Sequence, residues 1–127
     1  MIASMQRSTR QRAAIRRVLD QAARPLAPAE VLAAAAAEVP GLGQATVYRT
    51  LSALVADGHT VAVELPGGLT CYERRHEHHH HHFHCRGCGR VFEVDGCPGR
   101  LERLAPRGFQ VDGHELTLYG RCAECRR

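Results

Sequence analysis

The sequence lacks any long apolar segment. None approaches the roughly 18 consecutive apolar residues of a membrane-spanning helix, and Met1 to Arg7 lack the basic and then apolar pattern of a secretory signal peptide. Internal repeats are also absent. We therefore expect a cytoplasmic protein without a membrane partner.

With 127 residues and 44% hydrophobic content, the chain has little apolar material for a core. This is enough for one ordinary domain or for two very small ones. If the chain forms two domains, the weaker one needs an additional link between its parts.

Arginine is concentrated near the start of the chain. The formal net charge is +4, and five arginines between residues 7 and 17 contribute much of the excess. Such a block favours an anionic partner, while a solvated helix face is the alternative interpretation. The block consists of Arg7, Arg10, Arg12, Arg16 and Arg17.

Residues up to about 57 predict three helices. Ser8 and Gln11 resemble a capping box, and the apolar side chains that follow recur at helical spacing. Pro28 is suited to be the first residue of a second helix, which runs to Glu38.

A third helix is predicted from 44 to 57. Its apolar residues recur at i, i+4, i+7 and i+8 and form one buried stripe, made by Val47, Leu51, Leu54 and Val55. The opposite face carries small residues around Arg49, so it is thin enough to enter a groove.

A β-hairpin should follow, because the apolar pattern from Thr60 has a period of two and Pro66 to Gly68 form a turn. Three helices and a hairpin are the parts of a winged helix-turn-helix. The fold class is therefore α+β, with an N-terminal winged helix-turn-helix domain at 1–75.

The remainder, 76–127, predicts a small C-terminal α/β domain. Short β-like runs lie near Phe83, at 91–94 and at 109–119, and a short helix begins near Pro98.

Two Cys-x-x-Cys pairs are the most specific signal in the sequence. In a reducing compartment such pairs indicate metal or redox chemistry rather than disulfides. Two pairs can complete a tetrahedral site of four thiolates without an open position, which is typical of structural zinc. Redox dithiols or unrelated buried cysteines are the alternatives. The four cysteines are Cys85, Cys88, Cys122 and Cys125.

A run of histidines directly precedes the first pair. If residues 78 to 84 are extended, His80 and His82 point to one face, and His79 and His81 point to the other. One strand could then serve two metal sites, although imidazole alone does not distinguish zinc, iron, nickel and copper. A solvated histidine loop that binds metals loosely is the alternative.

The sequence motifs and their order along the chain resemble those of the ferric uptake regulator family, over nearly the whole chain. The resemblance implies a winged-helix DNA-binding domain, a hinge near the histidines and an α/β domain that dimerises. The expected protein is a homodimeric, metal-dependent repressor that binds a palindromic operator in double-stranded DNA. The resemblance rests on Thr9-x-Gln11-Arg12, Ala29-Glu30, Ala45 to Leu51, Tyr72-Glu73, the histidine run, both cysteine pairs and His114-x-Leu116-x-Leu118-Tyr119-Gly120.

The resemblance also implies two further metal sites. A regulatory site between the domains would use Glu73, His80, His82 and Glu93. A second site would use His79, His81, His114 and an acid, for which Glu102 is the candidate.

Contacts to DNA are expected from two segments. In the third helix Thr46, Tyr48 and Arg49 face outward, and Arg7 and Arg10 belong to the basic block.

Leu26 is a departure from the family pattern, because members that sense iron, manganese or peroxide usually carry a histidine there. Leucine cannot ligate a metal. Cys71, on the same strand face as Glu73, and His59 are the substitutes that the sequence offers. A half-buried thiol and a surface histidine are the alternative interpretations.

The regulatory ion is expected to be Zn²⁺ rather than Fe²⁺ or Mn²⁺. The arginine-rich start and the histidine run resemble zinc uptake regulators of actinobacteria, and Leu26 argues against an iron or peroxide sensor. Arg75 and Val61 stand where those proteins have a thiolate and a carboxylate, so an iron, manganese or peroxide sensor of the same family is the alternative.

Two other classes of protein would account for part of the sequence. A zinc hydrolase needs an open coordination position and a general base. Glu73 or Glu77 could act as the base, but no substrate-positioning motif accompanies them. A histidine-rich metal-storage protein would leave the segment from Ala45 to Leu51 unexplained.

Overall fold

The computed structural model describes residues 2–127, with side chains from residue 6 onward. The chain divides into two compact units, Met1–His76 and Glu77–Arg127. No helix in the described residues is both long enough and apolar enough to cross a bilayer.

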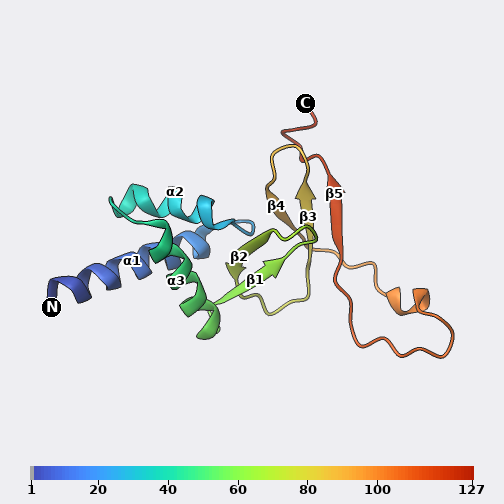
Figure 1. The fold of residues 1–127 in the computed structure, drawn as a ribbon. Helices are drawn as coiled ribbons and strands as arrows, with labels where there is room; N and C mark the ends of the chain where they lie inside the picture. The colour runs from blue at the N-terminus through green and yellow to red at the C-terminus, as the bar shows by residue number, and fades with distance from the viewer. Residues whose placement is uncertain (1) are drawn as a thin grey trace. The chain divides into compact units, whose positions relative to one another are not determined.

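The first unit contains three helices and a hairpin, as the sequence predicts (Figure 1). Helix α1 spans Ile2–Gln21, α2 spans Pro28–Glu38 and α3 spans Gln44–Ala56. Ser8 lies inside α1, so the predicted capping box at this residue is wrong. No helix-breaking residue precedes Ser8, and the helix therefore begins earlier.

The core of the first unit forms where the apolar stripes of the three helices meet. Val47, Leu51 and Leu54 of α3 are fully buried, whereas Val55 is half-buried. These side chains pack with Ile15 and Leu19 of α1 and the apolar face of α2. This packing leaves the opposite face of α3 in solvent.

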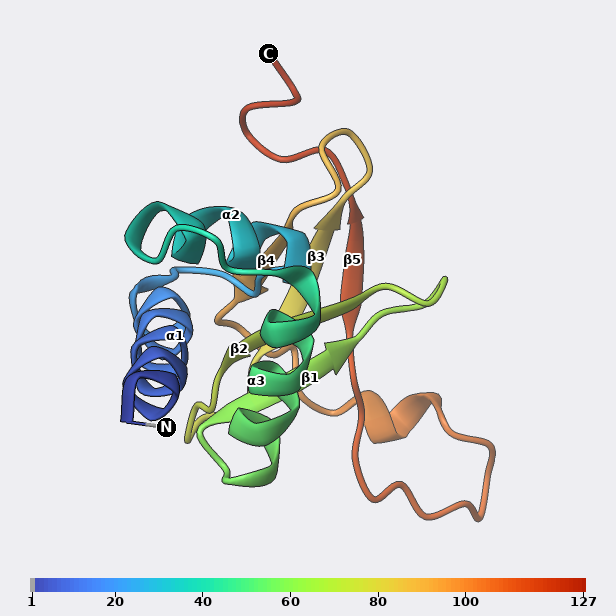
Figure 2. The ribbon, with the colours of Figure 1, turned by 60° about the vertical axis from the view of Figure 1, so that its left-hand side comes forward.

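The hairpin pairs β1 (Thr60–Glu64) with β2 (Thr70–Arg74) in antiparallel register. Gly67 and Gly68 have positive φ angles of 95° and 86° in its turn, a backbone conformation that glycine adopts without strain. Figure 2 shows this turn projecting to the right, away from the three helices.

Leu26 adds a further backbone connection to the hairpin. Its N–H donates to the carbonyl of Tyr72, and the N–H of Tyr72 donates to the carbonyl of Leu26. The side chain of Leu26 is buried in the helical core. The leucine at this position is therefore a core residue.

The second unit is a three-stranded sheet with the order β4-β3-β5. Strand β3 (His81–Cys85) is antiparallel to β4 (Val91–Val94) and parallel to β5 (Thr117–Gly120). In Figure 1 the chain between β4 and β5 makes a long excursion from the sheet. The buried side chains of the second unit are His81, Cys85 and Val91. This unit therefore has almost no apolar core of its own.

Two predictions for the second unit were only partly right. The short helix expected near Pro98 is a single 3-10 turn, η1, at Leu101–Leu104. The strand expected at 109–119 is limited to β5, because Gly113 interrupts the apolar pattern and no strand of the described chain pairs with residues 109 to 115.

Candidate metal centres

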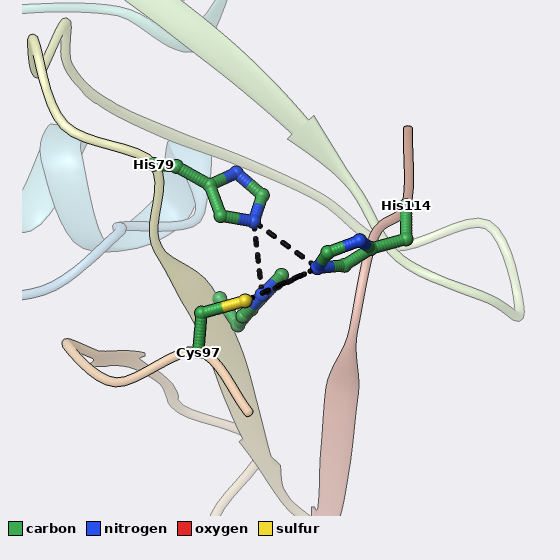
Figure 3. Close-up of side chains that lie close together, drawn as sticks. His79, Cys97 and His114 are labelled. Carbon is green, nitrogen blue, oxygen red and sulfur yellow. Dashed lines mark hydrogen bonds between the residues drawn. The ribbon is translucent and has the colours of Figure 1, made fainter. Parts of the chain in front are cut away.

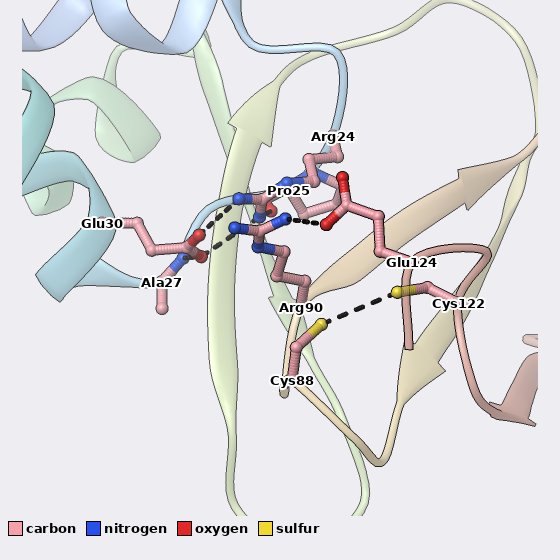
Figure 4. Close-up of polar contacts among 8 residues, drawn as sticks. All are labelled: Arg24, Pro25, Ala27, Glu30, Cys88, Arg90, Cys122 and Glu124. Carbon is pink, nitrogen blue, oxygen red and sulfur yellow. Dashed lines mark hydrogen bonds and ion pairs between the residues drawn. The ribbon is translucent and has the colours of Figure 1, made fainter. Parts of the chain in front are cut away.

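The four cysteines of the Cys-x-x-Cys pairs converge at one end of the second unit. Cys85 ends β3 and Cys122 follows β5, and because these strands are parallel, both pairs lie at the same edge of the sheet. All four Sγ atoms lie within 4.8 Å of one another. The Sγ atoms of Cys88 and Cys122 are 3.9 Å apart (Figure 4), close to the spacing of about 3.8 Å expected for a tetrahedron with Zn–S bonds of about 2.3 Å.

Hydrogen bonds within the group shift the pKa values of two of these thiols in opposite directions. The backbone N–H groups of Cys88 and Cys122 donate to Sγ of Cys85 at 3.4 and 3.2 Å, and they lower the pKa of Cys85 to about 6. Hydrogen bonds with the Cys122 and Cys85 side chains raise the pKa of Cys125 to about 12. Four thiolates repel one another unless a cation lies between them, so this donor set fits Zn²⁺.

Gly87, between the first two cysteines, is a residue whose role the sequence analysis missed. A Cβ atom at this position would lie 2.9 Å from Sγ of Cys125. The first cysteine pair therefore needs glycine here to let the second pair approach. An exposed ion pair between Arg90 and Glu124, with an N–O distance of 3.4 Å, also joins the two pairs (Figure 4).

A second group of ligands lies at the other end of β3. His79 precedes this strand, His81 is its first residue, and His114 lies just before β5. The Nε2–Nε2 distances are 3.0 Å for His79 and His81, 3.3 Å for His79 and His114, and 3.2 Å for His81 and His114. Burial and the neighbouring imidazoles lower the pKa of His81, which favours the neutral ring that binds metals.

Cys97, and not Glu102, joins these three histidines. Sγ of Cys97 lies 3.3 Å from Nε2 of His114 (Figure 3), and the four ligand atoms all lie within 4.8 Å of one another. Glu102 lies on the exposed turn η1 and does not belong to this group. The group therefore contains a thiol from the segment before η1 in place of the carboxylate expected from Glu102.

The residues expected at the regulatory site are arranged within each unit as follows. In the second unit, His82 is the cross-strand neighbour of Glu93, and the rings of His80 and His82 are 5.0 Å apart. In the first unit, Glu73 is only 5% exposed, and its Oε2 lies 3.9 Å from Nε2 of His76.

Cys71 and His59, the two suggested substitutes for the missing histidine, have other surroundings in the first unit. Burial raises the pKa of the Cys71 thiol to about 11, so the thiol stays protonated at neutral pH. His59 contacts Oγ1 of Thr60 at 2.7 Å and Oδ1 of Asp20 at 2.8 Å, which engages both ring nitrogens. Neither residue belongs to a candidate ligand group among the described residues.

The outer face of α3 carries the residues expected to contact DNA. Tyr48 is 47% exposed, and Arg49 is exposed and donates to Oγ1 of Thr46 at 3.2 Å. Arg7 and Arg10 are exposed on α1. A hollow of about 200 Å³ between α1 and α3 is lined by Ser8, Gln11, Arg12, Thr46, Arg49, Thr50 and Ala53. Its cationic and hydroxyl lining suits a phosphate group.

Known proteins resemble this chain in both sequence and structure. The profile of the Ferric uptake regulator family matches residues 3–119. The zinc uptake regulation protein of Mycobacterium tuberculosis strain H37Rv is 34% identical, over 99% of this chain and 99% of its own length.

Solved structures show the same similarity. The crystal structure of the Vibrio cholerae ferric uptake regulator has a TM-score of 0.72 and 30% identity, and the match covers 88% of each chain. FurB of M. tuberculosis, described as a zinc uptake regulator, has a TM-score of 0.58 and 34% identity, with 99% of this chain and 100% of that chain covered. The similarity therefore extends over both units.

Proposed function

Since the chain belongs to the ferric uptake regulator family, we propose that it is a metal-dependent, DNA-binding transcriptional repressor that controls metal homeostasis and responds to zinc. The observation that carries this proposal is the presence, in one short chain, of a winged helix with an exposed recognition face and of clustered metal ligands. As a regulator of transcription it would act in the cytoplasm.

DNA binding is assigned to the exposed face of α3. Tyr48 and Arg49 project from this helix, and Thr46 and Arg49 line the hollow that suits a phosphate. Residues of a recognition helix can contact base edges in the major groove, whereas Arg7 and Arg10 on α1 would contact the DNA backbone or the minor groove.

The cysteine pairs would hold a structural zinc. A unit of about fifty residues is usually too small to be stable through its apolar core alone, and the scarcity of buried apolar side chains supports this view. A closed site of four thiolates would connect the end of β3 to the chain that follows β5.

Regulation is assigned to Glu73, His80, His82 and Glu93. An ion held by two neutral imidazoles is stabilised by nearby carboxylates, which offset its charge. Glu73 belongs to the winged-helix unit, and the other three residues belong to the second unit. Binding of the ion would therefore bring the units together and fix the orientation of the winged helices.

The protein is proposed to act as a homodimer on a palindromic operator, since two copies related by a twofold axis match two half-sites. Large apolar side chains on the second unit support this assembly: Leu104 and Phe109 are 82% and 70% exposed, and Leu118 on the edge strand β5 is 45% exposed. A second copy would cover such a surface.

Zinc is favoured as the regulatory ion because the M. tuberculosis zinc uptake regulation protein matches the whole chain. Iron or manganese is the second candidate, because the V. cholerae ferric uptake regulator is also similar over both units and the carboxylates of Glu73 and Glu93 suit these ions.

The proposal is tested by selecting duplexes from a random library with the zinc-loaded protein, and then measuring gel retardation with each metal. We expect retardation of the selected duplex at a Zn²⁺ concentration at which Fe²⁺ and Mn²⁺ have no effect. Equal binding with and without any metal would refute metal-dependent repression, and a response to Fe²⁺ or Mn²⁺ alone would refute the zinc assignment.

A further inference from the structure

We infer that Cys97, His79, His81 and His114 form a closed four-ligand zinc site in the second unit, in which the Cys97 thiolate stands in place of the carboxylate expected from Glu102. The inference does not depend on DNA binding, because all four residues lie within one unit.

The three imidazoles bring their Nε2 atoms so close together that hydrogen bonds cannot form along all three contacts at once. Their Nε2 atoms form a triangle with sides of 3.0, 3.3 and 3.2 Å, and a proton on one nitrogen can serve only one side at a time. An ion at the centre of the group accepts all three lone pairs. A tetrahedral site with Zn–N bonds of about 2.0 Å separates two nitrogens by about 3.3 Å, which matches these distances.

Cys97 supplies the fourth vertex. Its Sγ lies 3.3 Å from Nε2 of His114, near the separation of about 3.5 Å expected between nitrogen and sulfur ligands of one zinc ion. In Figure 3 the thiol and the imidazoles of His79 and His114 point toward a common centre.

The donor set determines the class of ion. Three imidazoles and one thiolate contain no oxygen, so they suit Zn²⁺ and disfavour Mn²⁺ and other ions that prefer oxygen ligands. The thiolate also supplies a negative charge beside the ion. With four protein ligands the site has no open position, so it is structural or regulatory rather than catalytic.

The site would fix the excursion between β4 and β5. Cys97 lies near the start of this excursion and His114 near its end, while His79 and His81 are at the start of β3. Within the excursion η1 is the only regular element, so an ion would hold both of its ends against the sheet. At present the N–H of Leu116 donates to Nδ1 of His81 at 3.2 Å. Ligation through Nε2 would place the ring proton on Nδ1, and this contact would then open.

The test uses the whole 127-residue chain with its four-cysteine site filled by zinc, and Co²⁺ as the probe. Cobalt bound to a thiolate gives a sulfur-to-metal charge-transfer absorption, so the probe reports a sulfur ligand directly. Substituting both His80 and His82 by alanine removes the proposed regulatory site from the titration. In this background we expect one equivalent of Co²⁺ to bind with charge-transfer absorption.

Two matched variants identify the fourth ligand. Cys97→Ser should lose the charge-transfer absorption and bind Co²⁺ at least tenfold more weakly, whereas Glu102→Gln should keep both the absorption and the affinity. The inference is overturned if Cys97→Ser keeps the absorption, which would point to Cys71, or if Glu102→Gln alone loses affinity.

A second measurement keeps the inference testable if Cys97→Ser does not fold. Two equivalents of Zn²⁺ should slow the alkylation of Cys97 by iodoacetamide at least tenfold, because a coordinated thiolate is less nucleophilic. His79→Ala should abolish this protection while the four-cysteine site still retains zinc. Equal protection in His79→Ala would show that Cys97 is shielded by something other than this site.

Discussion

Arg12 and Asp57 form an ion pair across the first unit, with 2.8 Å between the guanidinium nitrogen and the carboxylate oxygen. The pair joins α1 to the C-terminal cap of α3. The backbone N–H of His59 and the Arg12 side chain lower the pKa of Asp57. Arg12 also lines the hollow beside Arg49, so Asp57 places a negative charge next to the proposed DNA-binding face.

Asp57→Asn should strengthen binding to any duplex, by about two- to fivefold at low salt, because Arg12 becomes available to a phosphate. The salt dependence should become steeper by about one counterion. Fluorescence anisotropy at several salt concentrations measures both effects. Because the pKa of Asp57 is lowered, the ion pair is complete above pH 3.8 and is lost only as the pH falls through the lowered pKa. The effect should therefore be constant between pH 6 and 8, and weaker binding by the variant would contradict this role of Arg12.

Arg49→Ala and Arg7→Ala should separate base recognition from charge. Loss of Arg49 should weaken binding to the selected operator by roughly 1 to 3 kcal/mol more than binding to random DNA. Loss of Arg7 should weaken binding to both duplexes alike and reduce the salt dependence. Parallel titrations of the two duplexes measure this difference. The reverse pattern would mean that α3 is not the recognition helix.

Cys85→Ser should abolish stable zinc binding at the cysteine pairs. The melting temperature of the second unit should fall by roughly 10 °C or more, since binding of the structural ion contributes directly to the free energy of folding. Elemental analysis and thermal denaturation provide the measurements, with Cys71→Ser as a cysteine control outside the site. Unchanged zinc content together with an unchanged melting temperature in Cys85→Ser would exclude a structural zinc.

Replacing both His80 and His82 by alanine should abolish the stimulation of DNA binding by metal while leaving the structural zinc in place. The matched double replacement of His79 and His81 should have a smaller effect, because these rings point to the other face of the strand. Gel retardation across a zinc titration tests this order. If the second pair had the larger effect, regulation would belong to the site that contains Cys97.

Cys71 should make the stability of the first unit depend on alkaline pH. The folded thiol has a pKa of about 11 against an ordinary value of 9.0, so the folded state keeps a proton that the unfolded chain loses. The stabilisation is complete below pH 9 and is lost as the pH rises toward 11. Between pH 8 and 10.5 the melting temperature of the zinc-loaded protein should fall roughly 5 °C further than that of Cys71→Ala. Identical pH profiles would contradict the raised pKa.

Most of the first unit could be predicted from the sequence because its signals are local. The apolar stripe of α3 and the proline at the start of α2 each determine a helix through neighbouring residues. The start of α1 was misjudged because Ser8 is suited to cap a helix but is also tolerated inside one. In the second unit the strand expected from residue 109 is shorter, since pairing with β3 depends on partners distant in the sequence.

The candidate metal ligands also differ in how far the sequence could predict them. Spacing alone identified the two cysteine pairs, and strand alternation separated His79 and His81 from His80 and His82. Cys97 could not be identified, because its approach to His114 depends on the path of the chain between them. The only signal in the sequence was a cysteine between Gly96 and Pro98 that no other role explained.

The parallel pairing of β3 with β5 determines whether the two parts of the protein stay together after the chain between them is cut. Every residue between Cys88 and Cys122 belongs to a loop whose two ends are held by the strand pair and, with the proposed structural zinc bound, would also be joined by the cysteine pairs. A protease that cuts once within the exposed stretch from 98 to 113 would therefore convert the protein into two polypeptides without separating them. Gel filtration of the nicked protein should show one species until a chelator is added, after which the C-terminal peptide should dissociate.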